Sequence, residues 1–372
     1  MALESPNTRL AKSPVRSFVT AALAIIATAS SAADVDHIFI DNYRLQISCE
    51  GYGTPTVIMD SGLGGSSLEW VFVSQRLREI TKVCTYDRAG YGASDMGPMP
   101  RTSSRIANEL FLLLNEASVS PPFILVGHSF GGYNMQLFAR RYPYLSAGLV
   151  LIDASHPDQV ERFLAPPLNM TTAPSTRYGI VQFRDPPPPH VRLPDKLKRR
   201  VIKLAGHWKM RRALASELLN FRDSARQIKA SKPLHDLPLI VITRGRIKGE
   251  HSAKRLLIEK LWLELQADLA ASSPVSAHLV AGGSGHHVHI EQPDLVAFAI
   301  AMLIDRHRSG RRDGLAAAPF DSKLRNRFKL NNAAWLKDDL SLYPAAAVVI
   351  ADSHVCADTW GEDCRSGEDG AP

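Results

Sequence analysis

Short runs of aliphatic and β-branched residues alternate along the chain with longer stretches in which apolar residues recur every three or four positions. The runs are typical of buried strands, and the longer stretches are typical of amphipathic helices. Their alternation predicts a mostly parallel sheet covered by helices, because parallel strands need crossover connections that helices commonly provide. The expected strands are residues 37–40, 43–49, 56–60, 82–87, 122–127, 147–153, 237–244 and 276–281.

Stretches of helical periodicity fall between these strands. Asp41 and Asn42 separate the first two strands and predict a hairpin, because both residue types tolerate the backbone conformation of tight turns. We expect helices at residues 74–80, 103–116, 134–141 and 293–307.

A long interruption separates the sixth strand from the seventh. It contains helix-like runs and the loop "DPPPPHVRLP" (185–194), which is extended because a polyproline run cannot continue a helix. We expect residues 157–235 to form a helical cap inserted into a core of residues 34–156 and 236–307. Residues 308–372 have little core-like periodicity and are expected to form a loosely ordered extension.

The first 33 residues have the pattern of a secretory signal. Three cations precede 17 uncharged residues, and small residues at Ser31 and Ala33 suit a cleavage site. We expect cleavage near Ala33 and a secreted or periplasmic protein. An uncleaved membrane anchor is the alternative, although the stretch is shorter than the roughly 20 apolar residues of a membrane span.

Charge is unevenly distributed in this chain of 372 residues with a net charge of +7. Residues 184–232 contain 14 Lys or Arg and four acidic residues. Such a segment either attracts an anionic substrate or surface or is a solvated helical face. The chain lacks the interleaved cations and aromatics of a nucleic-acid module, so no nucleic-acid partner is expected. A membrane surface is compatible with this segment, but nothing else in the sequence points to one.

A serine stands between glycines in "GHSFGG" (127–132), directly after an apolar strand and before a helix. The pattern G-x-S-x-G alone is a weak signal, but in this context it predicts a nucleophile elbow. The glycines leave room for a strained strand-to-helix turn. The helix N-terminus favours negative charge developing at the serine oxygen. We therefore expect Ser129 to be a nucleophile.

Four further motifs follow other strands: "DSGLGGSS" (60–67), "YDRAGYGASD" (86–95), "LIDASHPD" (151–158) and "GSGHHVHIEQPDL" (283–295). With "GHSFGG", and in this order, they resemble the serine-hydrolase branch of the α/β-hydrolase fold superfamily over residues 36–307. The resemblance implies an α/β fold with a mostly parallel eight-stranded sheet, flanking helices and an inserted helical cap. None of the motifs identifies a substrate.

The resemblance also implies a catalytic base on the loop after the last strand. In this superfamily the base usually follows a glycine there, which implies His286 after Gly285. His287 and His289 are rivals by composition. A histidine-rich surface loop or metal site is the other interpretation of this stretch. The chain has no close Cys/His cluster with zinc spacing, so neither a metal nor a cofactor is expected.

The third member of the expected triad is a carboxylate that orients the imidazole. In the superfamily it usually follows the seventh strand, but "VITRGRIKGEH" offers only Glu250. Some branches place the acid after the sixth strand, which implies Asp153. We favour Asp153 and keep Glu250 as the alternative.

An oxyanion hole would stabilise the tetrahedral intermediate. The resemblance implies the backbone N–H groups of Leu63 and Phe130. We expect Asp87 and Arg88 to anchor the loop at 86–95 by ion pairing and backbone hydrogen bonds, and His128 to be a packing and hydrogen-bonding residue.

The chain has four cysteines, and the sequence alone allows three complete pairings. The strand order of the superfamily makes the second and fourth strands neighbours, which implies a Cys49–Cys84 disulfide. We also expect a Cys356–Cys364 bond.

The expected function is that of an exported serine hydrolase acting on small ester or acyl substrates. Relatives with haloalkane dehalogenase or epoxide hydrolase activity carry an aspartate at the elbow, whereas this chain has Ser129. Amidase, thioesterase and acyltransferase reactions use the same triad and stay open. A ligand-binding receptor on a hydrolase scaffold is the alternative from another class.

Overall fold

The computed structural model describes residues 34–169, 189–246, 252–312, 315 and 326–328. These residues all belong to the second of two compact units, residues 32–372. The expected signal segment, residues 1–33, lies outside the described residues. In the described part, no helix combines the length and the apolar character needed to cross a bilayer.

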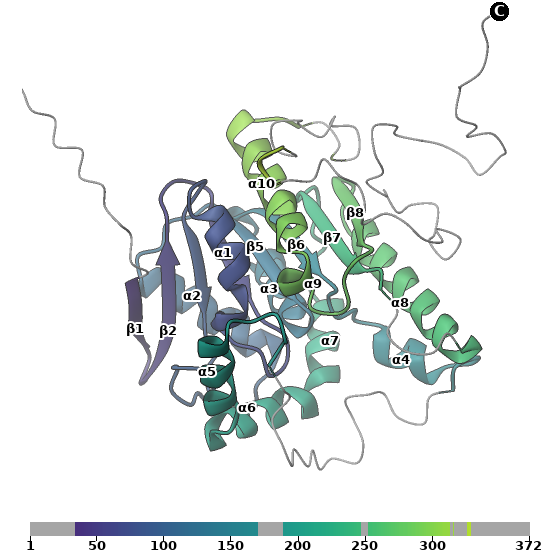
Figure 1. Ribbon diagram of the computed structural model, residues 1–372, viewed down its shortest axis with the longest axis horizontal. Helices are drawn as coiled ribbons and strands as arrows, with labels where there is room; N and C mark the ends of the chain where they lie inside the picture. The colour runs from purple at the N-terminus through teal and green to yellow at the C-terminus, as the bar shows by residue number, and fades with distance from the viewer. Residues whose placement is uncertain (1–33, 170–188, 247–251, 313–314, 316–325, 329–372) are drawn as a thin grey trace, which may run out of the picture. The chain divides into compact units, whose positions relative to one another are not determined.

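An eight-stranded sheet forms the centre of this unit, in the order β1-β2-β4-β3-β5-β6-β7-β8 (Figure 1). The hairpin of the first two strands and the β2–β4 pair are antiparallel, and all other neighbours are parallel. This confirms the predicted α/β-hydrolase architecture. The strands are β1 (Asp34–Ile40), β2 (Tyr43–Glu50), β3 (Thr56–Asp60), β4 (Val83–Tyr86), β5 (Phe123–His128), β6 (Ser146–Ile152), β7 (Leu239–Arg244) and β8 (Ser276–Ala281).

The central strands read as unbroken apolar runs because both of their faces are covered. In β5, Leu125 packs into one apolar cluster and Val126 into the other. Neighbouring β6 repeats this alternation with Leu149 and Val150. Side chains of a strand alternate between faces, so a strand buried on both sides cannot show a polar face.

Helices cover the two faces of the sheet (Figure 1). One face is covered by α1 (Val71–Leu77) and α10 (Pro293–Ser309), which contribute to one apolar cluster. The other is covered by α2 (Ser103–Glu116), α3 (Phe130–Arg141) and part of α8 (Ala253–Ala271). The positions predicted for α2 and α10 agree with the structure, whereas α3 begins four residues earlier than predicted.

Among the described residues between β6 and β7, where we expected a cap, there are four helices: α4 (Gln159–Leu164), α5 (Asp195–Ala205), α6 (Trp208–Leu219) and α7 (Phe221–Lys229). That they form a separate cap stays a prediction. The extension predicted to be loosely ordered is described only in part. Its residues Leu315 and Phe328 are buried and pack with α10 in the same apolar cluster.

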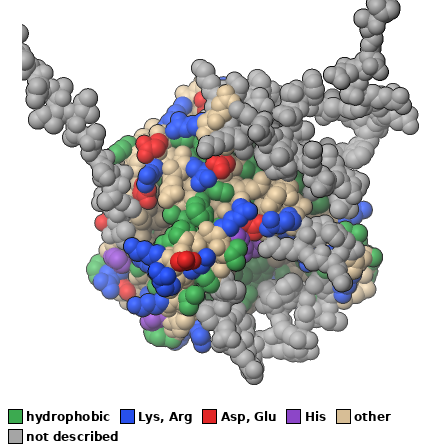
Figure 2. All heavy atoms as spheres, viewed as in Figure 1, with side chains coloured by type: hydrophobic (Ala, Val, Ile, Leu, Met, Phe, Trp, Pro, Cys, Tyr) green, Lys and Arg blue, Asp and Glu red, His purple; other side chains and the backbone are tan. Residues whose placement is uncertain are grey.

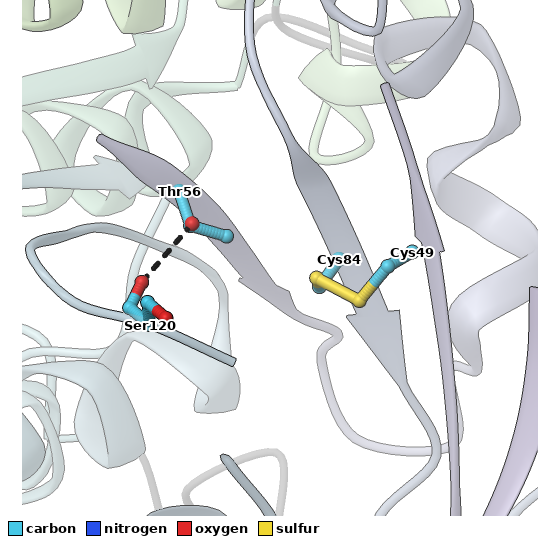
Figure 3. Close-up of a disulfide and its surroundings, with 4 residues drawn as sticks. All are labelled: Cys49, Thr56, Cys84 and Ser120. Carbon is cyan, nitrogen blue, oxygen red and sulfur yellow. Dashed lines mark hydrogen bonds between the residues drawn. A yellow bond between two sulfur atoms is a disulfide. The ribbon is translucent and has the colours of Figure 1, made fainter. Parts of the chain in front are cut away.

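A disulfide joins Cys49 of β2 to Cys84 of β4, as expected (Figure 3). The two residues face each other in the antiparallel register. On the far side of β4, the hydroxyl of Thr56 at the start of β3 donates to the carbonyl of Ser120 at 3.3 Å. The disulfide therefore links β2, which is antiparallel to β4, to the parallel part of the sheet that begins with the β4–β3 pair. The predicted Cys356–Cys364 pair lies outside the described residues.

Candidate active site

Ser129 stands at the sharp turn between β5 and α3. Its backbone has φ 52° and ψ −120°, a conformation that non-glycine residues seldom adopt. The turn is possible because glycines lie two residues before Ser129 and two and three residues after it. A Cβ at Gly127 would lie 2.6 Å from the carbonyl oxygen of Gly131, and a Cβ at Gly132 would lie 2.5 Å from the Cβ of Ala154. The strain at Ser129 is thus held by tight packing on both sides.

Asp153 follows β6 and is fully buried. Its Oδ2 lies 2.6 Å from Nδ1 of His286, which comes from the loop after β8. The ends of parallel strands meet at the same edge of the sheet, so residues 133 positions apart come together here. The rival acid, Glu250, lies outside the described residues.

The carboxylate of Asp153 has two further side-chain partners that the sequence analysis missed. Nη1 of Arg244 donates to Oδ2 at 2.7 Å, and the indole N–H of Trp262 donates to Oδ1 at 2.7 Å. Arg244 ends β7 and also contacts Glu259 of α8 at 3.0 Å. Burial by itself raises the pKa of Asp153, but Arg244, His286 and Trp262 together hold it well below its usual range. Asp153 is therefore an anion at neutral pH.

His128 precedes Ser129 and connects it to the histidine loop. Its ring Nε2–H donates to the backbone carbonyl of His286 at 2.9 Å, and the two ring centroids lie 4.6 Å apart. Burial lowers the pKa of His128 well below its usual value, so this ring stays neutral. The expected role in packing and hydrogen bonding agrees with these contacts.

The two rival histidines occupy different surroundings from His286. His289 is fully buried, and in the described part of the chain neither of its ring nitrogens has a hydrogen-bond partner. Its Nε2 lies 4.0 Å from Oε2 of Glu69, whose pKa is raised to about 7 by burial. The ring of His287 lies 5.5 Å from that of His128 and 5.4 Å from that of His190. Of the three, His286 is the residue bonded to Asp153.

The loop "SGLGG" (61–65) lies directly against Ser129. A Cβ at Gly62 would lie 3.0 Å from the Cβ of Ser129, so a side chain there would push the loop or Ser129 aside by a few tenths of an ångström. Leu63 comes next in the loop, and Phe130 opens α3. Within the described residues, the backbone N–H of neither Leu63 nor Phe130 donates a hydrogen bond. Both N–H groups can therefore donate a hydrogen bond to an oxygen atom of a bound molecule.

Arg88 fixes the shape of this loop. Its guanidinium donates to the carbonyls of Ser61 at 2.6 Å and Gly62 at 2.9 Å, and to Asp60 Oδ1 at 2.7 Å. Nε and Nη2 bind both carboxylate oxygens of Glu217, which α6 supplies from the segment between β6 and β7. All three charged side chains are 2% exposed or less. The loop and α6 are thus joined through one buried cation.

Asp87 anchors the following loop, as expected. Its Oδ1 accepts from the backbone N–H of Ser67 and its Oδ2 from that of Ala93, both at 2.9 Å. A Cβ at Gly92 would lie 1.8 Å from Oδ2 of Asp87, so a side chain there would displace the carboxylate.

Comparison with known proteins agrees with this arrangement. The model of the alpha/beta hydrolase family matches residues 57–300. The chain belongs to this family. Two solved hydrolase-fold structures illustrate the likeness. A candidate lipase, lip1, from Acinetobacter baumannii has a TM-score of 0.56 at 17% identity, covering 75% of this chain and 93% of that one. A candidate epoxide hydrolase from Pseudomonas aeruginosa has a TM-score of 0.59 at 17% identity, covering 75% and 98%. At such identities the likeness concerns the fold.

A relative by sequence, the probable transporter efuK of Hormonema carpetanum, is 23% identical to this alpha/beta hydrolase over 332 residues. The match covers 82% of the hydrolase and 44% of efuK. The chain therefore spans less than half the length of that relative.

No group of three or more His, Cys, Asp or Glu side chains among the described residues of the hydrolase is arranged to hold a metal ion. The residues missed from the sequence share a reason. The fold brings three side chains to the site from segments that carry none of its sequence motifs: Arg244, Trp262 and Glu217. The one available signal was the arginine that stands where the seventh strand usually delivers an acid.

Proposed function

We propose that this protein is a serine hydrolase that cleaves carboxylic esters through an acyl-serine intermediate. The observation that carries the proposal is the 2.6 Å contact between Asp153 and His286 beside the strained turn of Ser129. Nδ1 of His286 is engaged by Asp153, which leaves Nε2 to take the proton of the serine hydroxyl.

The proposed reaction has two halves. The hydroxyl oxygen of Ser129 attacks the ester carbonyl while its proton passes to His286. The resulting oxyanion accepts hydrogen bonds from the N–H groups of Leu63 and Phe130. The intermediate collapses to an acyl-serine as His286 returns the proton to the departing alkoxide. In the second half, water attacks the acyl-serine with His286 again as base, which releases the acid and restores Ser129.

The residue at the elbow favours this chemistry over epoxide hydrolysis. A carboxylate nucleophile opens an epoxide to an alkyl ester, whereas Ser129 offers a hydroxyl suited to acyl transfer. Amides, thioesters and acyl-transfer reactions involve the same intermediate. A panel of chromogenic esters, thioesters and anilides of varied chain length separates these substrates.

A fluorophosphonate probe tests the nucleophile. We expect one probe per molecule on Ser129, no labelling of Ser129→Ala, and a loss of ester hydrolysis in that variant of at least about 1,000-fold. Well-folded wild-type protein that takes up no probe would instead support a ligand-binding receptor.

For the acid, we expect Asp153→Asn to lower kcat by about 1,000-fold or more and Glu250→Gln to leave it unchanged. The reverse order would transfer the role to Glu250.

We also propose that the protein is exported. Its Cys49–Cys84 disulfide supports an oxidising compartment, because such bonds seldom persist in the cytosol. Protein recovered outside the cytoplasm should have an N-terminus near Asp34. Accumulation in the cytoplasm with Met1 retained would contradict export.

A further inference from the structure

An unusually basic surface is formed by residues 189–212, which comprise α5, the start of α6 and the segment before them. These residues contain nine Lys or Arg and a single acid, Asp195. Space-filling shows Lys and Arg side chains gathered over α5 and α6, with hydrophobic side chains between them (Figure 2). Such cations either form ion pairs and hydrogen bonds within the protein or remain available to a partner.

Three of the nine cations have a structural partner. Lys198 pairs with Asp195, Lys209 donates to the carbonyl of Ser94, and Arg192 donates to the carbonyl of Glu291. The other six are exposed and form no ion pair with the described part of the chain: Lys196, Arg199, Arg200, Lys203, Arg211 and Arg212. We call these six the basic face. The positive charge of the basic face is therefore not neutralised by acidic side chains of the described residues.

Apolar side chains are exposed within the same surface. Val191 is 80% exposed, Ile202 is 52% exposed and Trp208 is 61% exposed. They do not belong to the core beneath α5, because that helix contributes Ala205 to the buried apolar cluster while these three side chains are exposed. Ile202 lies beside Lys203 on the outer side. Exposed apolar residues among unpaired cations suit an interface that is both anionic and apolar.

We propose that the basic face, with Val191, Ile202 and Trp208, docks on an anionic lipid membrane. Cationic side chains approach the headgroups while the aliphatic and indole side chains enter the boundary with the acyl chains. A nucleic acid would satisfy the cations, but it would leave the two aliphatic side chains in water. A lipid boundary offers both chemistries together, with anionic headgroups directly above an apolar acyl layer.

The position of this surface connects it to the candidate active site. Beneath it, Ala205 and Met210 form a small apolar cluster with Tyr91, and Leu63 of the loop beside Ser129 packs against that cluster. Docking would therefore bring the lipid surface close to the loop that shapes the site. The docking proposal itself does not depend on the assignment of the triad.

Vesicle sedimentation with the full chain tests the proposal. We expect binding to vesicles of 70% phosphatidylcholine and 30% phosphatidylserine, and little binding to phosphatidylcholine alone. Replacing Lys196, Arg199, Arg200 and Lys203 with Gln should weaken binding by about five-fold for each cation removed. A milder variant, Arg199→Gln with Lys203→Gln, keeps the test valid if the quadruple variant folds poorly by circular dichroism.

A matched control removes four exposed cations elsewhere: Arg222, Lys232, Lys254 and Lys260. We expect it to bind the anionic vesicles like the wild type. A Trp208→Ser variant should bind more weakly with its charge unchanged. Equal binding to both vesicle types, equal loss in the control, or preference for a 20-nucleotide DNA over vesicles would each overturn the proposal.

Discussion

At the scale of single residues, Arg244 is the distinctive feature of the candidate site. Oδ2 of Asp153 accepts hydrogen bonds from both the guanidinium of Arg244 and the ring of His286. Arg244 is also held over the ring of Trp262, with 4.7 Å between the guanidinium carbon and the ring centroid. A permanent positive charge next to the acid lessens the field that Asp153 exerts on the imidazole.

Arg244→Gln should move the acid limb of the pH profile of kcat/KM to higher pH. Without the guanidinium, the carboxylate has the protonated imidazole as its main cationic partner and stabilises it more. Arg244→Lys keeps the charge and should keep the wild-type limb. Initial rates on the best ester of the panel, measured from pH 4 to 9, provide the test. A loss of kcat with an unmoved limb would reduce Arg244 to a packing role.

The same substitution has a separate effect on stability. The pKa of Asp153 is lowered on folding, so its ionisation stabilises the folded state above about pH 4, the ordinary value for aspartate. That stabilisation is lost as the pH falls through the lowered value. Arg244→Gln brings the folded pKa closer to the ordinary one, so acid unfolding should begin at a higher pH than in the wild type.

At the scale of elements, the pairing of Arg88 with Glu217 links α6 to the loop beside Ser129. Neutralising this buried carboxylate is costly, because the guanidinium of Arg88 then keeps only Asp60 of its two charged partners. The loop carbonyls of Ser61 and Gly62 rely on the same guanidinium. A change in α6 should therefore affect the loop as well as the stability of the fold.

Glu217→Gln should lower the free energy of unfolding by about 3 kcal/mol and also lower kcat. The matched control is Asp95→Asn, which removes the partner of Arg44 in an ion pair with both side chains exposed. That change should cost less than about 1 kcal/mol. Urea unfolding and ester kinetics on the three proteins provide the comparison. Equal losses in the two variants would contradict a special role for the buried pair.

The elements differ in how far the sequence predicts them. The strands were found because burial on both faces makes them continuous apolar runs, as in β3, whose predicted bounds agree with the structure. The helix α8 was not predicted, although it supplies Trp262 and Glu259 to the site. Its apolar residues are spread around the helix, so it shows no clear stripe.

The sequence likewise indicates some residues of the candidate site and not others. Ser129, Asp153 and His286 belong to local motifs, each at the end of a strand, so sequence patterns could indicate them. The other partners of Asp153 and Arg88, which are Arg244, Trp262 and Glu217, come from the end of β7, α8 and α6, and no local pattern marks such side chains. Long-range pairs of this kind depend on strand order and helix placement, which a single sequence does not state.

At the scale of the whole described unit, the disulfide joins the antiparallel strands to the rest of the sheet. Its two cysteines are separated by 35 positions. The closed loop restricts the unfolded chain, which stabilises the folded state. The catalytic candidates follow β5, β6 and β8, beyond β4 and β3 in the strand order. The bond should matter for stability more than for catalysis.

A Cys49→Ser, Cys84→Ser double variant should lose about 4 kcal/mol of unfolding free energy, as chain entropy predicts for a loop of this length. Its kcat at low temperature should stay within about two-fold of the wild type. Reduction of the native protein with dithiothreitol should have the same effect on stability. An unchanged denaturation midpoint in both experiments would show that the bond does not constrain the unfolded chain.

The residues of the proposed triad follow three different strands. The reactivity of Ser129 should therefore depend on correct alignment of these strands. Gly127 of β5 pairs with Leu151 of β6, and Ile152 of β6 pairs with Ile242 of β7. A slip of one residue along any of these pairs shifts a strand by about 3.3 Å, more than the length of a hydrogen bond. Titration with an irreversible phosphonate would then count only molecules whose strands are aligned, and the fraction labelled after refolding would measure the yield of the native topology.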